Sequence, residues 1–174
     1  EANGYFCAAK FQQNDMHVKP LSIIGTLFNS LCSRFAEDAS PLQLKSVSVE
    51  LTNALGSQAG LLAGVVTSLP KLMPSDIQLE ETSSTCVDAP SSMRYLFGEL
   101  LRVISSNSSR PISLFVDDIQ FADSASLLLI GDLLFSAARF DLRVFFAFCH
   151  RDNDPDFDSG AFDIWLSSIS MYGL

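Results

Sequence analysis

Residues 113–130 read SLFVDDIQFADSASLLLI, and this stretch decides the class of fold. Its first apolar run is typical of a buried strand, but the run ends in two adjacent carboxylates, Asp117 and Asp118. A polar turn follows, and a second apolar run predicts a helix from Ser124 to Ala138. Carboxylates at the end of a buried strand cost free energy unless a cation or a hydrogen-bond donor satisfies them. These two residues therefore mark a candidate functional site.

Strand-like and helix-like segments alternate along the rest of the chain. Short apolar runs at 4–11 and 142–149 are typical of strands, and the continuous apolar character of the second predicts burial on both faces. The spacing of apolar residues predicts four further helices, at 21–36, 41–55, 61–69 and 91–104. This order of elements predicts a three-layer α/β fold, in which helices flank a parallel sheet.

The segments between these elements are expected to be loops. Pro74 to Pro90 is polar, rich in Ser and Thr and without periodicity, which predicts a flexible loop. Residues 105–110 are expected to form a turn, and in the helix before it Tyr95 is expected to face inward with its apolar neighbours. The sequence of residues 152–174 predicts an acidic loop and tail, with a short helix at 162–169.

The acidic loop also has some of the features of a calcium site. Counting from Asp152, acidic residues occupy positions 1, 3, 5 and 12, which is the ligand spacing of an EF-hand. Against this, Phe157 stands where an EF-hand needs glycine, and Pro155 stiffens the loop. A solvated acidic loop is therefore the default interpretation.

Composition limits the classes of function. The 174 residues are 48% apolar and 18% charged, which is ordinary for a globular protein. A net charge of −9 argues against a surface for nucleic acid or for anionic membranes, since both need clustered Lys and Arg. No apolar run approaches the roughly 18–20 residues of a membrane span. The four cysteines are scattered without a C-x-x-C pair, which predicts reduced thiols in a cytoplasmic protein rather than zinc or disulfides.

Two interpretations of Asp117 and Asp118 follow from the residues alone. In a parallel α/β sheet, ligands bind beyond the carboxyl ends of the strands, where both residues stand. Nucleotide-hydrolysing proteins place there one carboxylate that holds Mg²⁺ through water and another that polarises the attacking water. Alternatively, both side chains cap turns or the next helix, for which Ser124 or Asp123 is the expected N-cap.

The stretch LFVDDIQFADSASL resembles the Walker B segment of STAND-class P-loop ATPases, which are related to the AAA-type domain of origin-recognition proteins. The likeness is to the ATPase module of large bacterial and algal hybrid kinases, where hydrophobic residues precede Asp-Asp, Leu-Gln-Trp-Ala-Asp and then Ser-Leu. This chain has Ile119 for the usual Leu and Phe121 for the usual Trp.

Three other segments resemble the same family in the same order. GYFCAAKFQQ resembles its Gly-Tyr-Phe…Gly-Lys-Phe-Asp-Gln strand, with Ala9 for Gly and Gln12 for Asp. ALGSQAGLLAGVVTSLPKL resembles its Ala-Leu-Gly…Leu…Ile-Pro-Leu segment. FFAFCHRDND resembles its Tyr-Arg-Asp-Asn-Glu strand end, with His150 for Tyr and Asp154 for Glu. Together these segments span residues 4–154.

The resemblance implies a role for three residues. Asp117 matches the acid that coordinates Mg²⁺, and Asp118 matches the residue that activates water. Arg151 matches a sensor arginine for the γ-phosphate, a role that suits a guanidinium because its fork pairs with phosphate oxygens. Alternatively, Arg151 is a solvated charge held by an acidic neighbour in its own loop. Gln120 and Asp123 also match the pattern, with turn geometry and capping as the simpler roles.

One departure from the family is serious. The phosphate-binding pattern G-x-x-x-x-G-K-[ST] is absent, and no Gly-Lys-Ser/Thr follows the glycines at 56, 60 and 64. In the relatives, that loop and its strand come just before the Gly-Tyr-Phe strand. Residues 1–174 are therefore expected to form a single partial P-loop ATPase domain, incomplete at its N-terminus and unable to hydrolyse ATP by itself.

The predicted function is thus part of an ATP-binding and ATP-hydrolysing signalling switch that uses Mg²⁺. The expected partners are kinase-like effector domains of the same polypeptide and further copies of the protein, with neither nucleic acid nor a membrane span. The alternative is a regulatory or scaffold module that kept the fold and lost nucleotide turnover. Ala9, Gln12 and Phe121 differ from the residues usual at these positions in the family, and such substitutions agree with a loss of turnover.

Overall fold

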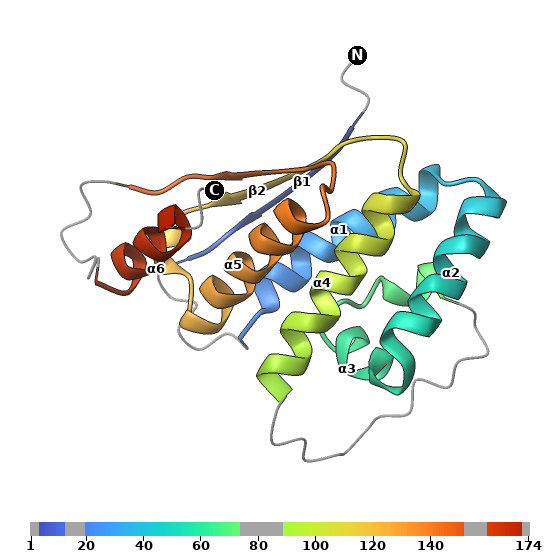
Figure 1. Ribbon diagram of the computed structural model, residues 1–174, viewed down its shortest axis with the longest axis horizontal. Helices are drawn as coiled ribbons and strands as arrows, with labels where there is room; N and C mark the ends of the chain where they lie inside the picture. The colour runs from blue at the N-terminus through green and yellow to red at the C-terminus, as the bar shows by residue number, and fades with distance from the viewer. Residues whose placement is uncertain (1–3, 13–19, 74–88, 152–159, 172–174) are drawn as a thin grey trace.

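Three parallel strands form the sheet that positions the candidate site. The computed structural model describes residues 4–12, 20–73, 89–151 and 160–171. Strands β1 (Tyr5–Lys10), β2 (Ile112–Asp117) and β3 (Val144–Phe148) lie in the order β1-β2-β3 (Figure 1). All three predicted strands are confirmed, although β1 and β3 are shorter than predicted. Because the strands are parallel and in register, their carboxyl ends meet at one edge of the sheet.

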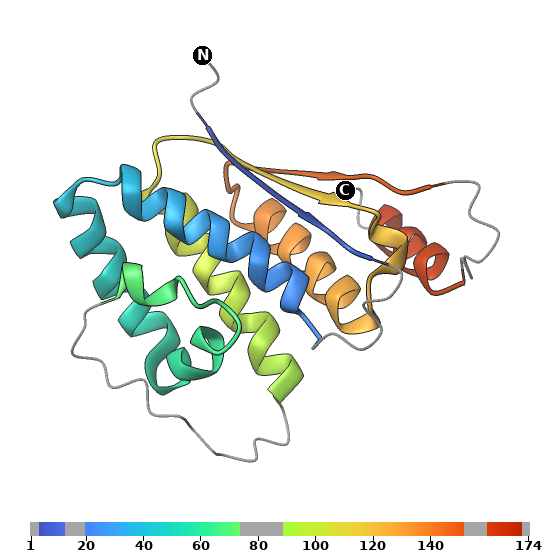
Figure 2. The same cartoon turned by 180° about the vertical axis from the view of Figure 1, so that it is seen from behind.

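The helices of the described residues lie on one side of this sheet, as both cartoon views show (Figures 1 and 2). The α-helices are α1 (Ser22–Asp38), α2 (Pro41–Leu55), α3 (Ala59–Ala63), α4 (Ala89–Asn107), α5 (Ser124–Arg139) and α6 (Gly160–Met171). Short 3₁₀ helices are η2 (Gly56–Gln58), η3 (Leu69–Leu72) and η4 (Ile119–Phe121).

Side chains cap the first turns of α2 and α5. Ser40 precedes α2 and forms a capping box with Gln43, so the first turn of the helix has partners for its free N–H groups. The N-cap of α5 is Asp123 rather than Ser124. Its carboxylate accepts hydrogen bonds from the backbone N–H of Ser126 at 2.9 Å and from the hydroxyl of the same residue at 2.6 Å.

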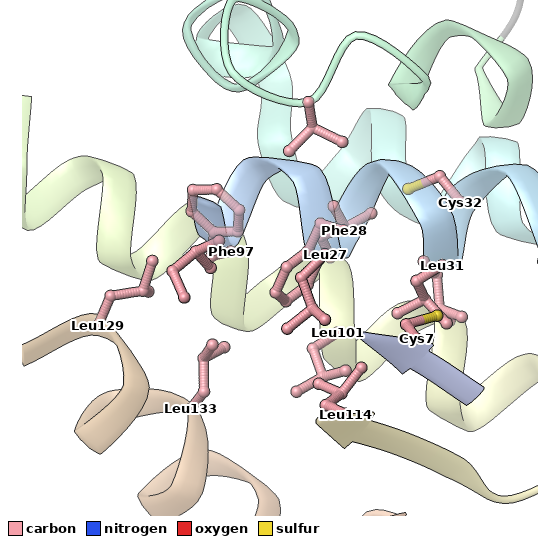
Figure 3. Packing of buried hydrophobic residues seen from close by; sticks show 14 of the residues in the cluster. Cys7, Leu27, Phe28, Leu31, Cys32, Phe97, Leu101, Leu114, Leu129 and Leu133 are labelled. Atoms are coloured by element: carbon pink, nitrogen blue, oxygen red, sulfur yellow. The ribbon is translucent and has the colours of Figure 1, made fainter. Parts of the chain in front are cut away.

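One continuous apolar core lies between the sheet and the helices. Phe28 of α1 and Phe97 of α4 are fully buried, and their rings meet edge to face with 4.9 Å between centroids. Figure 3 shows these rings among leucines of α1, α4 and α5, near Cys7 of β1 and Leu114 of β2. Burial raises the pKa of the Cys32 thiol to about 12, so this cysteine behaves as a core residue.

The predicted third layer is not found in the described part of the chain. On the face of the sheet that points away from the helices, Phe6 is 55% exposed and Phe145 is 67% exposed. The prediction that 142–149 is buried on both faces is therefore wrong for β3. Successive side chains of a strand point to opposite faces, and the described helices cover only one of them. The architecture shown is an α/β fold with a three-stranded parallel sheet and helices packed against one face.

The third predicted helix, 61–69, has the wrong bounds. Helix α3 ends at Ala63, and the chain turns before it enters η3. Pro70 lies in the first turn of η3, where its missing N–H removes no hydrogen bond, instead of ending an α-helix.

Helix α4 is longer than predicted, and its last three residues are helical where a turn was expected. The side-chain amide of Asn107 donates a hydrogen bond to the carbonyl of Val103 at 3.0 Å, which supports this last turn. Tyr95 was predicted to face inward but is 57% exposed, because Leu96 and Phe97 take the core-facing positions of that turn.

Two predicted segments lie mostly outside the described residues. Of the loop predicted at 74–90, only the last two residues are described, and they begin α4. The acidic positions at 152–159, including most of the candidate calcium loop, are likewise outside. The described tail, 160–171, is helical as α6. In the described part of the chain, no helix has the length and apolar character needed to cross a membrane.

Candidate functional site

The site lies where the three strands end. Lys10 is the last residue of β1 and is paired in register with Asp117, the last residue of β2. Backbone hydrogen bonds continue beyond the last residues of the strands. After β1, the N–H of Phe11 donates to the carbonyl of Asp117 at 3.1 Å. After β2, the N–H of Ile119 donates to the carbonyl of Cys149 at 3.0 Å. These hydrogen bonds fix the segments after the three strands side by side, so residues distant in sequence meet at this edge.

Asp118 has an unusual backbone conformation. Its φ of 50° and ψ of 44° lie in the left-handed region, which few residues other than glycine adopt. The conformation turns the chain from β2 into η4, and Asp117 supports it by accepting a hydrogen bond from the N–H of Asp118 at 2.9 Å. Asp118 is only 4% exposed. A nearly buried carboxylate in a strained backbone indicates a position that surrounding interactions determine.

Arg151 follows β3 and binds Asp118 through both arms of its guanidinium. Nε donates to Oδ1 at 3.0 Å and Nη2 donates to Oδ2 at 2.8 Å. This is the two-pronged geometry in which arginine recognises a planar carboxylate. Asp118 thus holds Arg151. The acidic neighbours in the loop after Arg151 lie outside the described residues, so the alternative that they hold it stays a prediction. The structure brings Asp117, Asp118 and Arg151 to one edge of the sheet, and the roles assigned to them stay predictions.

Lys10 completes the cluster and was not singled out from the sequence. Its ammonium lies 2.6 Å from Oδ2 of Asp117 and 2.7 Å from Oδ2 of Asp118, so it bridges the two carboxylates. One sequence signal pointed to this residue: it is the Lys of the Lys-Phe pair in the segment that resembles the ATPase family. That its strand is the neighbour of the strand that ends in Asp117 is known only from the structure. Lys10, Asp117, Asp118 and Arg151 are called the strand-end cluster below.

The charges of the strand-end cluster stabilise one another. Hydrogen bonds from Lys10 lower the pKa of Asp117, and hydrogen bonds from Lys10 and Arg151 lower the pKa of Asp118. The same contacts raise the pKa of Lys10. All four groups are therefore charged at neutral pH, with two acids facing two bases. The bases are the more accessible partners, because the side chain of Lys10 is 50% exposed and that of Arg151 is 60% exposed.

Gln120 and Asp123, which also matched the family pattern, have different roles. Asp123 caps α5, as described above, which is the simpler of its two predicted roles. Gln120 lies in η4 and is only 7% exposed, yet neither its amide oxygen nor its amide nitrogen has a hydrogen-bond partner among the described residues. Turn geometry alone does not explain a buried amide without partners, because such a group costs free energy.

The donor set decides what kind of metal ion could bind here. Among the described residues, no group of three or more His, Cys, Asp and Glu is placed to hold a metal ion. The strand-end cluster offers two adjacent carboxylates, of which Asp117 is the more exposed. Mg²⁺ is commonly held by one or two carboxylates together with water and phosphate oxygens. Two adjacent carboxylates would fit Mg²⁺ if water and phosphate oxygens supplied its other ligands.

Comparison with known proteins adds no relative from which a role could be transferred. No protein-family model, no curated protein and no solved structure matches the chain. The assignment of a function therefore rests on the residues and on the geometry of the strand-end cluster.

Proposed function

We propose that this chain is part of a nucleotide-dependent switch, in which ATP with Mg²⁺ engages the strand-end cluster. The observation that carries the proposal is the arrangement of Asp118, which is buried, backbone-strained and held by Lys10 and Arg151 at the carboxyl edge of a parallel sheet. Ligands of parallel α/β sheets bind beyond this edge.

The geometry supports a switch because two cations can leave the carboxylates. Lys10 places its ammonium where it neutralises both acids, which is the region a divalent cation would need. The long, half-exposed side chains of Lys10 and Arg151 can reorient toward solvent or toward an anion. Phosphate oxygens compete for both side chains, while Mg²⁺ competes with them for Asp117 and Asp118. Bound and free states would therefore differ in which charges pair.

The resemblance suggests how the roles divide. Asp117 would hold Mg²⁺ through water, Asp118 would orient the attacking water, and Arg151 would contact the γ-phosphate. The metal ion, when bound, supplies positive charge that offsets the charge developing on the phosphate oxygens. The 174 residues lack the G-x-x-x-x-G-K-[ST] pattern. The phosphate-cradling amides and the kinase-like effectors would therefore belong to parts of the natural polypeptide outside these residues.

A second candidate is a regulatory or scaffold module without turnover. The observation that favours it is that Lys10 already compensates both carboxylates. In that case the strand-end cluster is an ion-pair network that ties the ends of β1, β2 and β3 together.

Divalent-cation binding distinguishes the two candidates. Mn²⁺ serves as a paramagnetic substitute for Mg²⁺, and the relaxation of water protons reports its binding to the natural polypeptide with and without ATP. We expect ATP-dependent binding in the wild type, tighter binding without ATP in Lys10→Met because the competing ammonium is removed, and loss of binding in Asp117→Asn. Lys45→Met is the matched control, since Lys45 is an exposed lysine on α2. Equal behaviour of all four proteins would favour the scaffold module.

A further inference from the structure

The outer face of α5 has an unusual stripe of side chains. Leu128, Asp132, Phe135 and Arg139 are spaced four, three and four residues apart, so they share one face of the helix. This α5 stripe is exposed along its length: Leu128 is 55% exposed, Phe135 is 49% exposed, and the side chain of Asp132 is 51% exposed. The spacing is that of a helix seam that packs against another helix.

Shallow hollows flank the α5 stripe on both sides. One, of about 370 Å³, lies between α5 and α6, and its lining is mostly apolar. The other, of about 330 Å³, lies between α4 and α5. Asp132 and Phe135 line both hollows, so the α5 stripe is a ridge between two grooves. Figure 1 shows α5 between α4 and α6.

The charges of the α5 stripe are arranged symmetrically. Asp132 precedes Phe135 and has an exposed contact with Arg94 at 3.3 Å. Arg139 follows Phe135, and its guanidinium lies 5.4 Å from the ring centroid of Phe140. Within the described residues no carboxylate lies within ion-pair distance of Arg139. The stripe thus has an acid at one end, an aromatic ring in the middle and a base at the other end. Two antiparallel copies of such a stripe place the acid of each opposite the base of the other.

We propose that a second copy of this chain docks on the α5 stripe, with the two α5 helices antiparallel about a two-fold axis near Phe135. The midpoint between positions 132 and 139 falls beside Phe135, so the rotation places Asp132 opposite Arg139 of the partner at both ends. The two Phe135 rings meet at the axis. The same rotation places Leu128 opposite position 143 of the partner, just beyond the end of its α5. A two-fold contact of this kind uses the same surface on both copies.

A second copy fits better than an unrelated partner because of this charge order. Each chain carries a net charge of −9, so association elsewhere on the acidic surface meets repulsion, whereas the α5 stripe is locally balanced. The open face of the sheet is also apolar, but it presents no charge order that selects an occupant. A helix of 16 residues is about 24 Å long, so the contact is at the small end of specific interfaces and the dimer is weak and salt-dependent.

Charge exchange tests the proposal, measured as sedimentation of the 174-residue chain over a range of concentrations. We expect a reversible monomer–dimer equilibrium in the wild type and a loss of dimer in Asp132→Arg and in Arg139→Asp, each of which places like charges opposite each other. Mixing the two variants restores opposite charges at both ends, so a heterodimer is expected. The double variant, with both charges exchanged, is expected to dimerise again.

Apolar substitutions give a second, independent route. Phe135→Ser is expected to weaken dimerisation at least tenfold, whereas Leu42→Ser, at an apolar position of α2 that is 81% exposed, is expected to have no effect. A wild type that stays monomeric at all concentrations would overturn the proposal. So would a dimer that none of the α5 variants affects, or single variants that fail to recombine although circular dichroism shows them folded. The result is independent of nucleotide binding, because the α5 stripe contains no residue of the strand-end cluster.

Discussion

Arg151 and Asp118 form a two-pronged contact that joins the segment after β3 to the end of β2, with Nε–Oδ1 at 3.0 Å and Nη2–Oδ2 at 2.8 Å. The two residues are 33 positions apart, and they meet only because β2 and β3 are neighbouring parallel strands. The contact holds a nearly buried carboxylate in a left-handed backbone conformation. It therefore links the stability of the sheet edge to the proposed chemistry.

Replacing Asp118 with Asn should destabilise the fold. Asn tolerates the left-handed conformation, but a neutral amide loses the charge-assisted hydrogen bonds to Arg151 and Lys10. We expect a loss of about 1–2 kcal/mol in the free energy of unfolding, measured by urea denaturation. Asp141→Asn is the matched control, because Asp141 also has a positive φ of 49° but is exposed. Equal effects at the two positions would show that the strand-end cluster contributes nothing.

The pH dependence of stability should have two limbs. The pKa values of Asp117 and Asp118 are lowered in the folded state. Their contribution to the free energy of unfolding is therefore fully present above the ordinary carboxyl pKa of about 3.9, and it is lost as the pH falls through the folded-state pKa values. The folded pKa of Lys10 is raised, so its contribution is present below about 10.4 and is lost as pH rises through the folded value.

Urea midpoints measured across the pH range check both limbs. Lys10→Met should abolish the part of the alkaline loss that Lys10 causes and weaken the acid loss. If Lys10→Met and the wild type give parallel curves at both ends, the ion pairs seen in the structure do not persist in solution.

Two glycines in helix interiors should respond to alanine in opposite directions. A Cβ at Gly25 would lie 2.7 Å from Cγ1 and 2.8 Å from the carbonyl oxygen of Val65, so Gly25→Ala should destabilise by about 1–3 kcal/mol. A Cβ at Gly98 would lie 3.7 Å from its nearest neighbour, Oγ of Ser136. Gly98→Ala should stabilise by about 0.5–1 kcal/mol through helix propensity. Thermal melts of the two variants side by side check the sign of each effect.

The aromatic pair in the core should contribute strongly to stability. Phe28 is fully buried and meets Phe97 edge to face, so Phe28→Ala should cost about 3–5 kcal/mol. Leu42→Ala, at an exposed position, should change stability little. A small effect of Phe28→Ala in urea denaturation would contradict the packing of α1 against α4.

Much of the fold could be predicted from local patterns. Ser40, Pro41 and Gly56 mark the two ends of α2, and apolar spacing marks α1 and α5. The errors have physical causes. The apolar run 142–149 indicates a strand, but it does not show whether helices cover one face of the sheet or both. The described helices cover only one face, so part of β3 is exposed. The exposure of Tyr95 depends on the rotation of α4 against its neighbours, which spacing alone left undecided.

The candidate site was predicted in part. Asp117 and Asp118 are adjacent in sequence and end a strand, so their position at the sheet edge was predictable. Lys10 was missed because its contacts are 107 residues away and depend on which strands are neighbours. The missing partners of the Gln120 amide become visible only once its burial is known.

The most direct test of the proposed function separates ATP binding from ATP hydrolysis in the natural polypeptide that contains these residues. The measurement compares the affinity for ATP with the steady-state hydrolysis rate in the wild type and in Asp118→Asn, both checked for folding. The nucleotide switch predicts that hydrolysis falls by about 100-fold or more while ATP affinity changes little, because the proposed role of Asp118 is to act on the attacking water. Equal loss of binding and hydrolysis, or no change in either, would contradict the role assigned to Asp118.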